Sequence, residues 1–75
     1  MTPYRDWDND SGVKAYDVGP KHIDVAFKGG AVYRYTEQSV GTRNLSQMVE
    51  LAKAGEGLNS FIQRVVRKRY SEKLK

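Results

Sequence analysis

Cysteine is absent from the 75 residues of this chain, which excludes a disulfide framework and any metal site built on thiolates. A chain this short hides only about 60% of the surface that its unfolded form exposes. Its longest apolar runs are two or three residues, as in Phe61-Ile62, far short of a membrane span. The acidic N-terminus also lacks the apolar centre of a signal peptide. We therefore expect a soluble, cytoplasmic protein of one domain that does not contact membranes.

Sequence signatures of catalysis are also missing. His22 is the single histidine, and there is no cysteine nucleophile or Gly-x-Ser-x-Gly turn for it to serve. No glycine-rich phosphate-binding pattern precedes a predicted helix. We therefore expect a protein that is not an enzyme and needs no cofactor.

The N-terminal segment is acidic and superficially follows the spacing of a calcium loop. Asp6, Asp8 and Asp10 alternate, and Asp17 follows eleven residues after Asp6. However, Ser11 stands where such a loop needs glycine for its sharp turn, and Asp17 is shorter than the bidentate glutamate that closes the loop. The pattern therefore favours a solvated, partly disordered acidic arm over residues 1–11, with no metal site.

Alternating apolar and polar residues predict three strands, at 13–18, 22–27 and 31–36. Gly19-Pro20 separates the first two strands, and Gly29-Gly30 separates the second from the third. Short connections of this kind join antiparallel neighbours. The first half of the domain is therefore expected to be an antiparallel meander.

Beyond residue 42 the apolar spacing becomes helical. Thr42 or Asn44 is expected to cap the start of a first helix, and Gly55 its end. A second helix is expected to run from Leu58 into the C-terminal tail. The apolar positions of the two helices are Leu45, Met48, Val49 and Ala52, and Leu58, Phe61, Ile62, Val65 and Val66.

These elements predict an α+β fold, in which a three-stranded antiparallel β-meander is followed by two helices packed on one face (βββαα). The expected boundaries are an arm over 1–11, a single domain over 12–72 and a basic tail over 73–75.

The register of the second hairpin determines which way its aromatic side chains point. A two-residue turn would place Arg34 opposite Val25 and press a guanidinium into the apolar face, at a cost of several kcal/mol. A three-residue loop over 28–30, with Gly30 left-handed, instead places Tyr33 opposite Val25. We favour this second register. It directs Ile23, Val25, Phe27, Tyr33 and Tyr35 toward the helices, and it leaves Asp24, Lys28 and Arg34 facing water.

The order of these features resembles the KTSC family, small domains named for their place at the C-terminus of some lysyl-tRNA synthetases and also found as free-standing bacterial and phage proteins. The resemblance covers roughly residues 11–70. Its central mark is a Tyr-x-Tyr motif, carried by Tyr33 and Tyr35. The other matching positions are Phe27, Gly30, Val40, Gly57, Asn59, Ile62, Arg64 or Arg67, and Tyr70. The loop before Val40-Gly41 and the "AGEG" connection at 54–57 depart from the family pattern. The resemblance implies the βββαα fold and favours RNA as a ligand, because RNA binding has been suggested for this family.

Positive charge is concentrated in the C-terminal half of the chain. The net charge is +4, but residues 1–42 carry five basic against six acidic side chains, whereas residues 43–75 carry eight against three. On the predicted second helix, Arg64, Arg67, Lys68 and Lys75 form a cationic face that could follow phosphates, and Arg34 is expected to assist from the open face of the sheet. The residues expected to bind nucleic acid are Arg34, Arg64, Arg67, Lys68 and Lys75.

Each of these features also has a structural interpretation. The basic face suits a solvated helix whose cations favour the negative end of the helix dipole, and the family tyrosines are expected to line the core. The function expected from the sequence is a small non-enzymatic domain that binds nucleic acid, RNA rather than DNA, through a basic C-terminal helix. The alternative is a protein–protein interaction module, such as a phage-encoded modulator of a host protein, that uses Trp7, an edge strand or the open sheet face.

Overall fold

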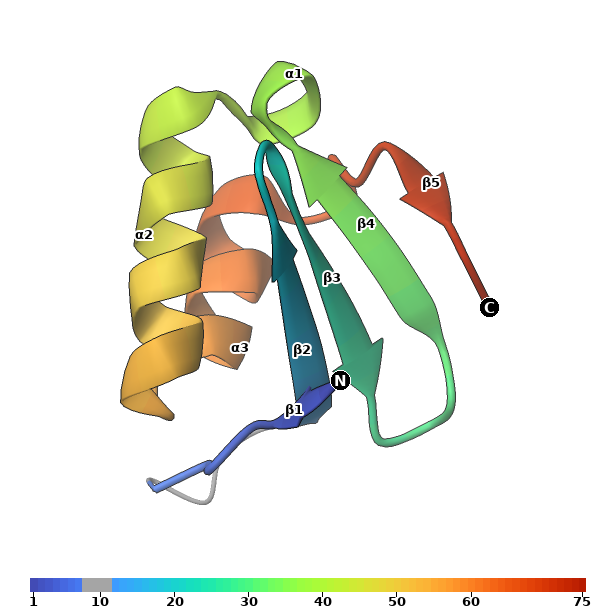
Figure 1. The fold of residues 1–75 in the computed structure, drawn as a ribbon, viewed down its shortest axis with the longest axis vertical. Coiled ribbons are helices and arrows are strands. Elements are labelled where there is room, and N and C mark those ends of the chain that lie inside the picture. The colour runs from blue at the N-terminus through green and yellow to red at the C-terminus, as the bar shows by residue number, and fades with distance from the viewer. Residues whose placement is uncertain (8–11) are drawn as a thin grey trace.

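The computed structural model describes residues 1–7 and 12–75. It shows an α+β fold in which helices cover one face of an antiparallel sheet with strand order β1-β2-β3-β4-β5 (Figure 1). We call the opposite face of the sheet the uncovered face. In chain order the elements are β1 (Thr2–Pro3), β2 (Val13–Gly19), β3 (His22–Phe27), β4 (Val32–Thr36), α1 (Glu37–Val40), α2 (Thr42–Ala54), α3 (Leu58–Phe61), the π-helix η1 (Ile62–Val66) and β5 (Glu72–Lys73).

The predicted meander corresponds to β2, β3 and β4, and its predicted register is confirmed. Val25 lies opposite Tyr33 and Ile23 lies opposite Tyr35. The amide of Phe27 donates to the carbonyl of Ala31 at 2.8 Å, and Gly30 has a φ of 104°, which closes the three-residue loop. Tyr33 and Tyr35 therefore point to the helical side, and Arg34 points to the uncovered face.

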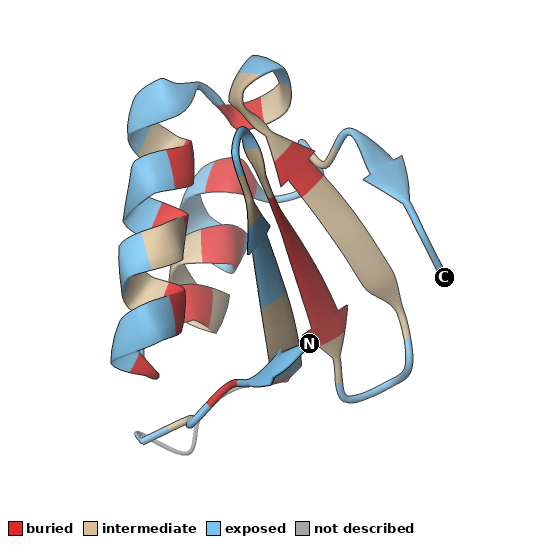
Figure 2. Ribbon diagram, viewed as in Figure 1, coloured by how far each residue is buried: buried red, intermediate tan, exposed pale blue. Residues whose placement is uncertain are grey.

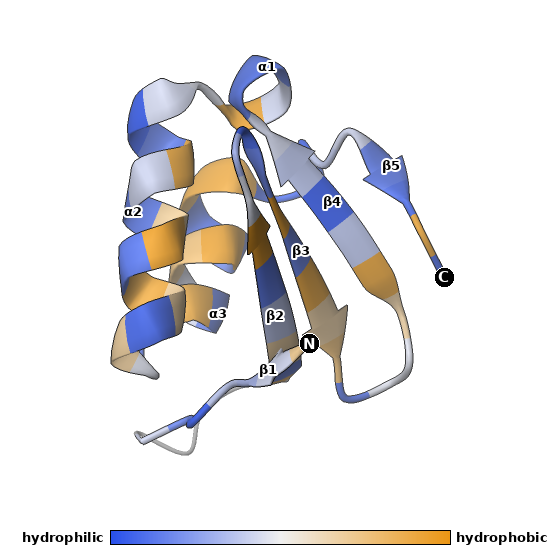
Figure 3. Cartoon of the chain, viewed as in Figure 1, coloured by the Kyte–Doolittle hydropathy of each residue, from blue (hydrophilic) through white to orange (hydrophobic). Residues whose placement is uncertain are grey.

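The core lies between the sheet and the helices, as Figure 2 shows by the buried residues on their facing sides. The apolar residues of α2 and α3 in Figure 3 line the same interior. Val65 departs from the predicted apolar stripe, because its side chain is 42% exposed. A π-helix turns with i→i+5 hydrogen bonds, so side chains predicted at α-helical spacing shift out of line. The largest fully buried side chains are Tyr35, Ile23, Met48, Leu58, Val13, Val25 and Val66.

The predicted long C-terminal helix is wrong. Helical structure ends at Val66, and Arg67 takes a left-handed φ of 47° with a ψ of −118°. The amide of Arg69 donates to the Val66 carbonyl at 2.9 Å, so residues 66–69 form a tight turn. The chain then enters β5, which pairs with β4. Arg67, Lys68 and Lys75 consequently do not continue one helical face.

The described N-terminal residues pack against the domain, which corrects the expectation of a solvated arm for that part. β1 pairs with β2, and the buried Tyr4 hydroxyl accepts a hydrogen bond from the Leu58 amide at 3.1 Å. The side chain of Asp6 is only 11% exposed and lies 3.2 Å from Lys28 Nζ. Asp8, Asp10 and Ser11 of the suspected calcium spacing lie outside the described residues.

The helix ends agree only in part with the predicted caps. Gly55 ends α2 with a φ of 80°, as predicted. No side chain caps its start, however, where Gly41 precedes Thr42. The sequence reasoning missed the short α1, which Thr36 and Ser39 begin with a reciprocal capping box. None of the helices in the described part of the chain is long and apolar enough to span a membrane.

Candidate aromatic and cationic pocket

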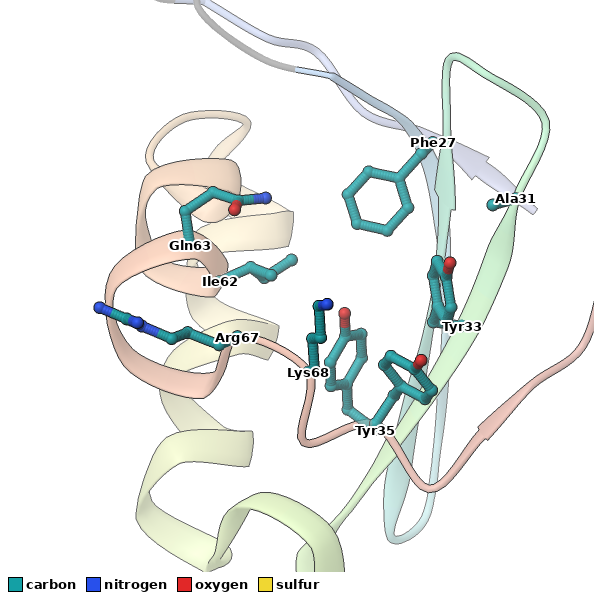
Figure 4. Close-up of a pocket in the computed structure, with 9 residues that line it drawn as sticks. Phe27, Ala31, Tyr33, Tyr35, Ile62, Gln63, Arg67 and Lys68 are labelled. Carbon is teal, nitrogen blue, oxygen red and sulfur yellow. The ribbon is translucent and has the colours of Figure 1, made fainter.

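A cavity of about 650 Å³ lies between η1 and the β3–β4 hairpin, on the helical side of the sheet (Figure 4). We call it the tyrosine pocket. Its volume falls in the range of small-molecule sites, about 300–1,000 Å³. The pocket is lined by Phe27, Ala31, Tyr33, Tyr35, Ile62, Gln63, Arg67, Lys68 and Tyr70.

Four aromatic rings form one connected wall of the tyrosine pocket. The Tyr33 and Tyr70 rings have centroids 4.4 Å apart at an interplanar angle of 38°. Tyr70 also meets Tyr35 edge to face at 6.3 Å, and Phe27 meets Tyr33 edge to face at 5.8 Å. Such pairs contribute about 0.5–1.5 kcal/mol each beyond the area that they bury. The wall is therefore held in place without a ligand.

Tyr35 and Tyr33 differ in burial although both line the tyrosine pocket. Tyr35 is 2% exposed, and this burial, with smaller contributions from Tyr33 and Tyr70, raises the pKa of its hydroxyl to about 12. Tyr35 is consequently neutral at physiological pH and able to donate a hydrogen bond. Tyr33 is only half-buried, so part of its ring remains accessible from solvent.

Two lysines lie close to the aromatic wall. The Lys68 side chain extends into the space between Ile62 and the tyrosines (Figure 4). Lys73 lies opposite Tyr33 in the β4–β5 register, and its Nζ lies 6.0 Å from the centre of the Tyr33 ring. This distance is at the outer limit of a cation–π contact. The pocket therefore combines accessible aromatic surface with at least two positive charges.

The other cations predicted on the helical face do not direct their charges into the cavity. Arg67 is part of the lining of the tyrosine pocket, but its guanidinium points away from the sheet (Figure 4). Arg64 is exposed on η1. Lys75 is also exposed, and its backbone carbonyl accepts from the amide of Val32, at the start of β4, at 3.2 Å. The structure thus brings Lys68 to the cavity and leaves these three residues around it.

The backbone next to the tyrosine pocket is unusual in two ways. π-Helical segments occur often at functional sites, and η1 forms one wall of this cavity. The positive φ of Arg67 is rare for a residue with a side chain, and such strain of about 1–3 kcal/mol clusters at ligand sites. These two irregularities support the assignment of the pocket as the candidate site.

Arg34 lies on the other side of the sheet and is engaged there. Its Nε and Nη2 donate to the two carboxylate oxygens of Asp24 at 2.8 and 3.0 Å. This hydrogen-bonded ion pair raises the pKa of Arg34. Asp24 was expected to face water but is only 6% exposed, because the paired guanidinium and the neighbouring strands cover it. A phosphate at Arg34 would have to compete with this bidentate pair.

The uncovered face as a whole does not favour polyanions. Asp17 lies opposite Asp24 in the β2–β3 register, and Glu72 lies opposite Arg34 in the β4–β5 register. Each carboxylate of these pairs therefore points to the uncovered face. His22 Nε2 lies 3.8 Å from Asp24. The acidic groups on this face would repel phosphates approaching Arg34.

Sequence reasoning missed Lys73 and Gln63 as members or neighbours of the site, and it assigned Tyr70 only as a family position. Its prediction of a continuous helix placed Lys73 in a tail, and residues 71–75 (Ser-Glu-Lys-Leu-Lys) show no alternation that would have indicated a strand. The tyrosines were correctly directed toward the helices. What could not be foreseen was that the helical layer ends early and leaves a cavity beside them.

No protein-family model, curated protein or solved structure matches this chain. Membership of the KTSC family therefore stays a prediction that depends on the residues quoted above.

Proposed function

We propose that this protein is a non-enzymatic RNA-binding domain whose contact surface is the mouth of the tyrosine pocket. The observation that carries the proposal is that Lys68 lines the pocket together with the half-buried Tyr33, while Lys73 Nζ lies 6.0 Å from the centre of the same ring. Proteins that bind single strands combine cations along the backbone with aromatic rings beneath the bases. Arg64, Arg67 and Lys75 supply further positive charge around this contact.

The charge distribution of the molecule supports a single strand rather than a duplex. The basic residues beyond Val66 lie on a turn and a short edge strand, so this described segment forms no cationic helix for a major groove. RNA is favoured over DNA by the family resemblance. Arg34 is left out of the proposed contact because Asp24 already occupies its guanidinium.

Fluorescence anisotropy with a labelled single-stranded RNA of ten nucleotides and mixed sequence tests the proposal. At low salt we expect a Kd below about 100 μM, the weak limit of non-specific binding. Contacts with four to six phosphates would give a slope of log affinity against log salt of about −3 to −4, with the single-strand coefficient. Absence of binding below about 100 μM at low salt would contradict the proposal.

A matched set of lysine variants locates the contact. We expect Lys68→Ala and Lys73→Ala each to weaken binding and to make the salt slope less negative by about 0.7, the loss of one phosphate contact on a single strand. Lys53→Ala is the control, because Lys53 is an exposed lysine in the last turn of α2. Equal losses for all three variants would show that total charge, and not the pocket, determines binding.

A further inference from the structure

We infer that the tyrosine pocket admits one unstacked RNA base, with the phosphate beside that base held by Lys68 and Lys73. The inference depends on the proposed function and adds to it the part of the nucleic acid that enters the cavity. Binding of phosphates alone would need cations on a surface, whereas here the cations border a cavity with an aromatic wall.

The ring that a base would contact is Tyr33. Tyr70 covers one part of this ring at 4.4 Å and Phe27 meets it edge to face, so both orient it. Lys73 also approaches this ring: its Nζ lies 6.0 Å from the ring centre, and the residue belongs to a short, exposed edge strand. A base that enters the pocket contacts the part of the Tyr33 ring that Tyr70 leaves open, and Lys73, beside the same ring but outside the pocket lining, can then pair with the adjoining phosphate.

The cavity also offers polar groups to the edge of a base. The Gln63 amide is drawn facing the cavity from η1 (Figure 4), and it carries both donors and an acceptor. Tyr35, although only 2% exposed, also lines this space, and its side chain carries a hydroxyl group. With Lys68, these groups place a few polar atoms in a lining that is mainly apolar and aromatic, as in sites that orient a planar ligand.

Charge complementarity selects this occupant over an apolar segment. Lys68 is exposed and lines the pocket, so an apolar segment seated there would cover an ammonium group without giving it a partner. A nucleotide supplies a planar ring for the tyrosines and an anion for the lysines in one unit. An acidic peptide with an aromatic residue would share part of this chemistry, and the experiment below separates it from RNA.

The experiment compares two labelled strands of ten nucleotides at one salt concentration: single-stranded RNA, and an abasic phosphodiester strand that keeps the charges but lacks the bases. We expect the RNA to bind at least about 5-fold more tightly, the smallest effect of stacking one base on an aromatic ring. Equal affinity for both strands would overturn base insertion and leave RNA binding intact. Failure of both strands to bind would remove the proposed function as well, and capture of an acidic aromatic peptide in that case would point to protein recognition.

Substitutions of Tyr33 test whether the preference for RNA over the abasic strand arises in the tyrosine pocket. Tyr33→Phe retains the aromatic face and is expected to keep the preference for RNA over the abasic strand. Tyr33→Leu is expected to reduce that preference to less than about 2-fold. Circular dichroism checks that each variant folds. If Tyr33→Leu does not fold, Gln63→Met, which changes the wall of the pocket formed by η1, takes its place. Suppose that the folded Tyr33→Leu protein, or Gln63→Met in its place, still prefers RNA over the abasic strand as strongly as the original protein. That result would contradict insertion of a base into the tyrosine pocket.

Discussion

At the scale of single residues, two side chains combine a structural role with the candidate site. Tyr35 closes the core beside the tyrosine pocket, and its burial disfavours the ionised form of its hydroxyl. Arg67 ends η1 in a backbone conformation that favours glycine. Both were singled out in the sequence, Tyr35 for its position in the Tyr-x-Tyr motif and Arg67 for its charge. Their burial and strain could not be predicted, because each depends on where η1 ends.

The ionisation of Tyr35 should make the free energy of unfolding depend on pH in the alkaline range. Below pH 10, folded and unfolded chains both keep the proton, so Tyr35 adds no pH dependence. Between about pH 10 and 12 the unfolded chain loses the proton while the folded chain retains it, so stability falls as the pH rises. Urea unfolding at several pH values measures this fall, and Tyr35→Phe should make it smaller. An equal fall in that variant would contradict the burial of Tyr35.

Replacing Arg67 by glycine should separate stability from charge. The substitution relieves backbone strain of about 1–3 kcal/mol and costs about 0.5–1 kcal/mol in chain entropy, so we expect the free energy of unfolding to rise by about 1 kcal/mol. Arg64→Gly removes the same charge inside η1, where glycine should lower stability by about 1 kcal/mol. Chemical denaturation compares the two variants. Destabilisation of both by equal amounts would show that Arg67 is not strained.

At the scale of elements, the β3–β4 hairpin was predictable and the C-terminal segment was not. The hairpin register followed from one local choice, since the alternative loop would have directed Arg34 into the apolar face. The end of the second helix had no comparable local constraint: neither glycine nor proline follows Val66. Pairing of β5 with β4 replaces the expected helix there, which is a tertiary effect that overrides helix propensity.

The hairpin can be tested at its two glycines. Gly30 has a φ of 104° and no atoms that would meet an added Cβ, so Gly30→Ala should lower the free energy of unfolding by about 1 kcal/mol through backbone strain alone. Gly29 also has open space and lacks a positive φ. Gly29→Ala should therefore stay within about 0.5 kcal/mol of the original protein. Thermal unfolding of both proteins gives the comparison, and equal effects would contradict the three-residue loop.

At the scale of the whole molecule, the sheet separates two surfaces of different charge. The uncovered face carries Asp17, Asp24 and Glu72 around Arg34, whereas the helical side carries Lys68 and Lys73 beside the tyrosines. The sequence showed that the C-terminal half is basic. Along β4, however, successive side chains point to opposite faces of the sheet, so Arg34 and the two tyrosines beside it lie on different faces. Arg34 therefore lies away from the residues with which it was grouped.

This separation predicts that Arg34 and RNA binding are independent. Arg34→Met should lower the urea midpoint, because it leaves the carboxylate of Asp24 buried without its partner. The Kd for single-stranded RNA should change by less than about 2-fold under conditions where the variant is folded. Anisotropy titration measures this, with Lys68→Ala as the variant that should lose affinity. A loss for Arg34→Met as large as for Lys68→Ala would move the contact to the uncovered face.

The most direct test of the central claim is chemical-shift mapping of the labelled protein with single-stranded RNA, because it reports which face the ligand touches. We expect the largest changes in chemical shift at Tyr33, Gln63, Lys68, Tyr70 and Lys73. Largest changes on Ala15, Asp17, His22, Asp24 and Arg34 of the uncovered face, or no changes at millimolar RNA, would contradict it.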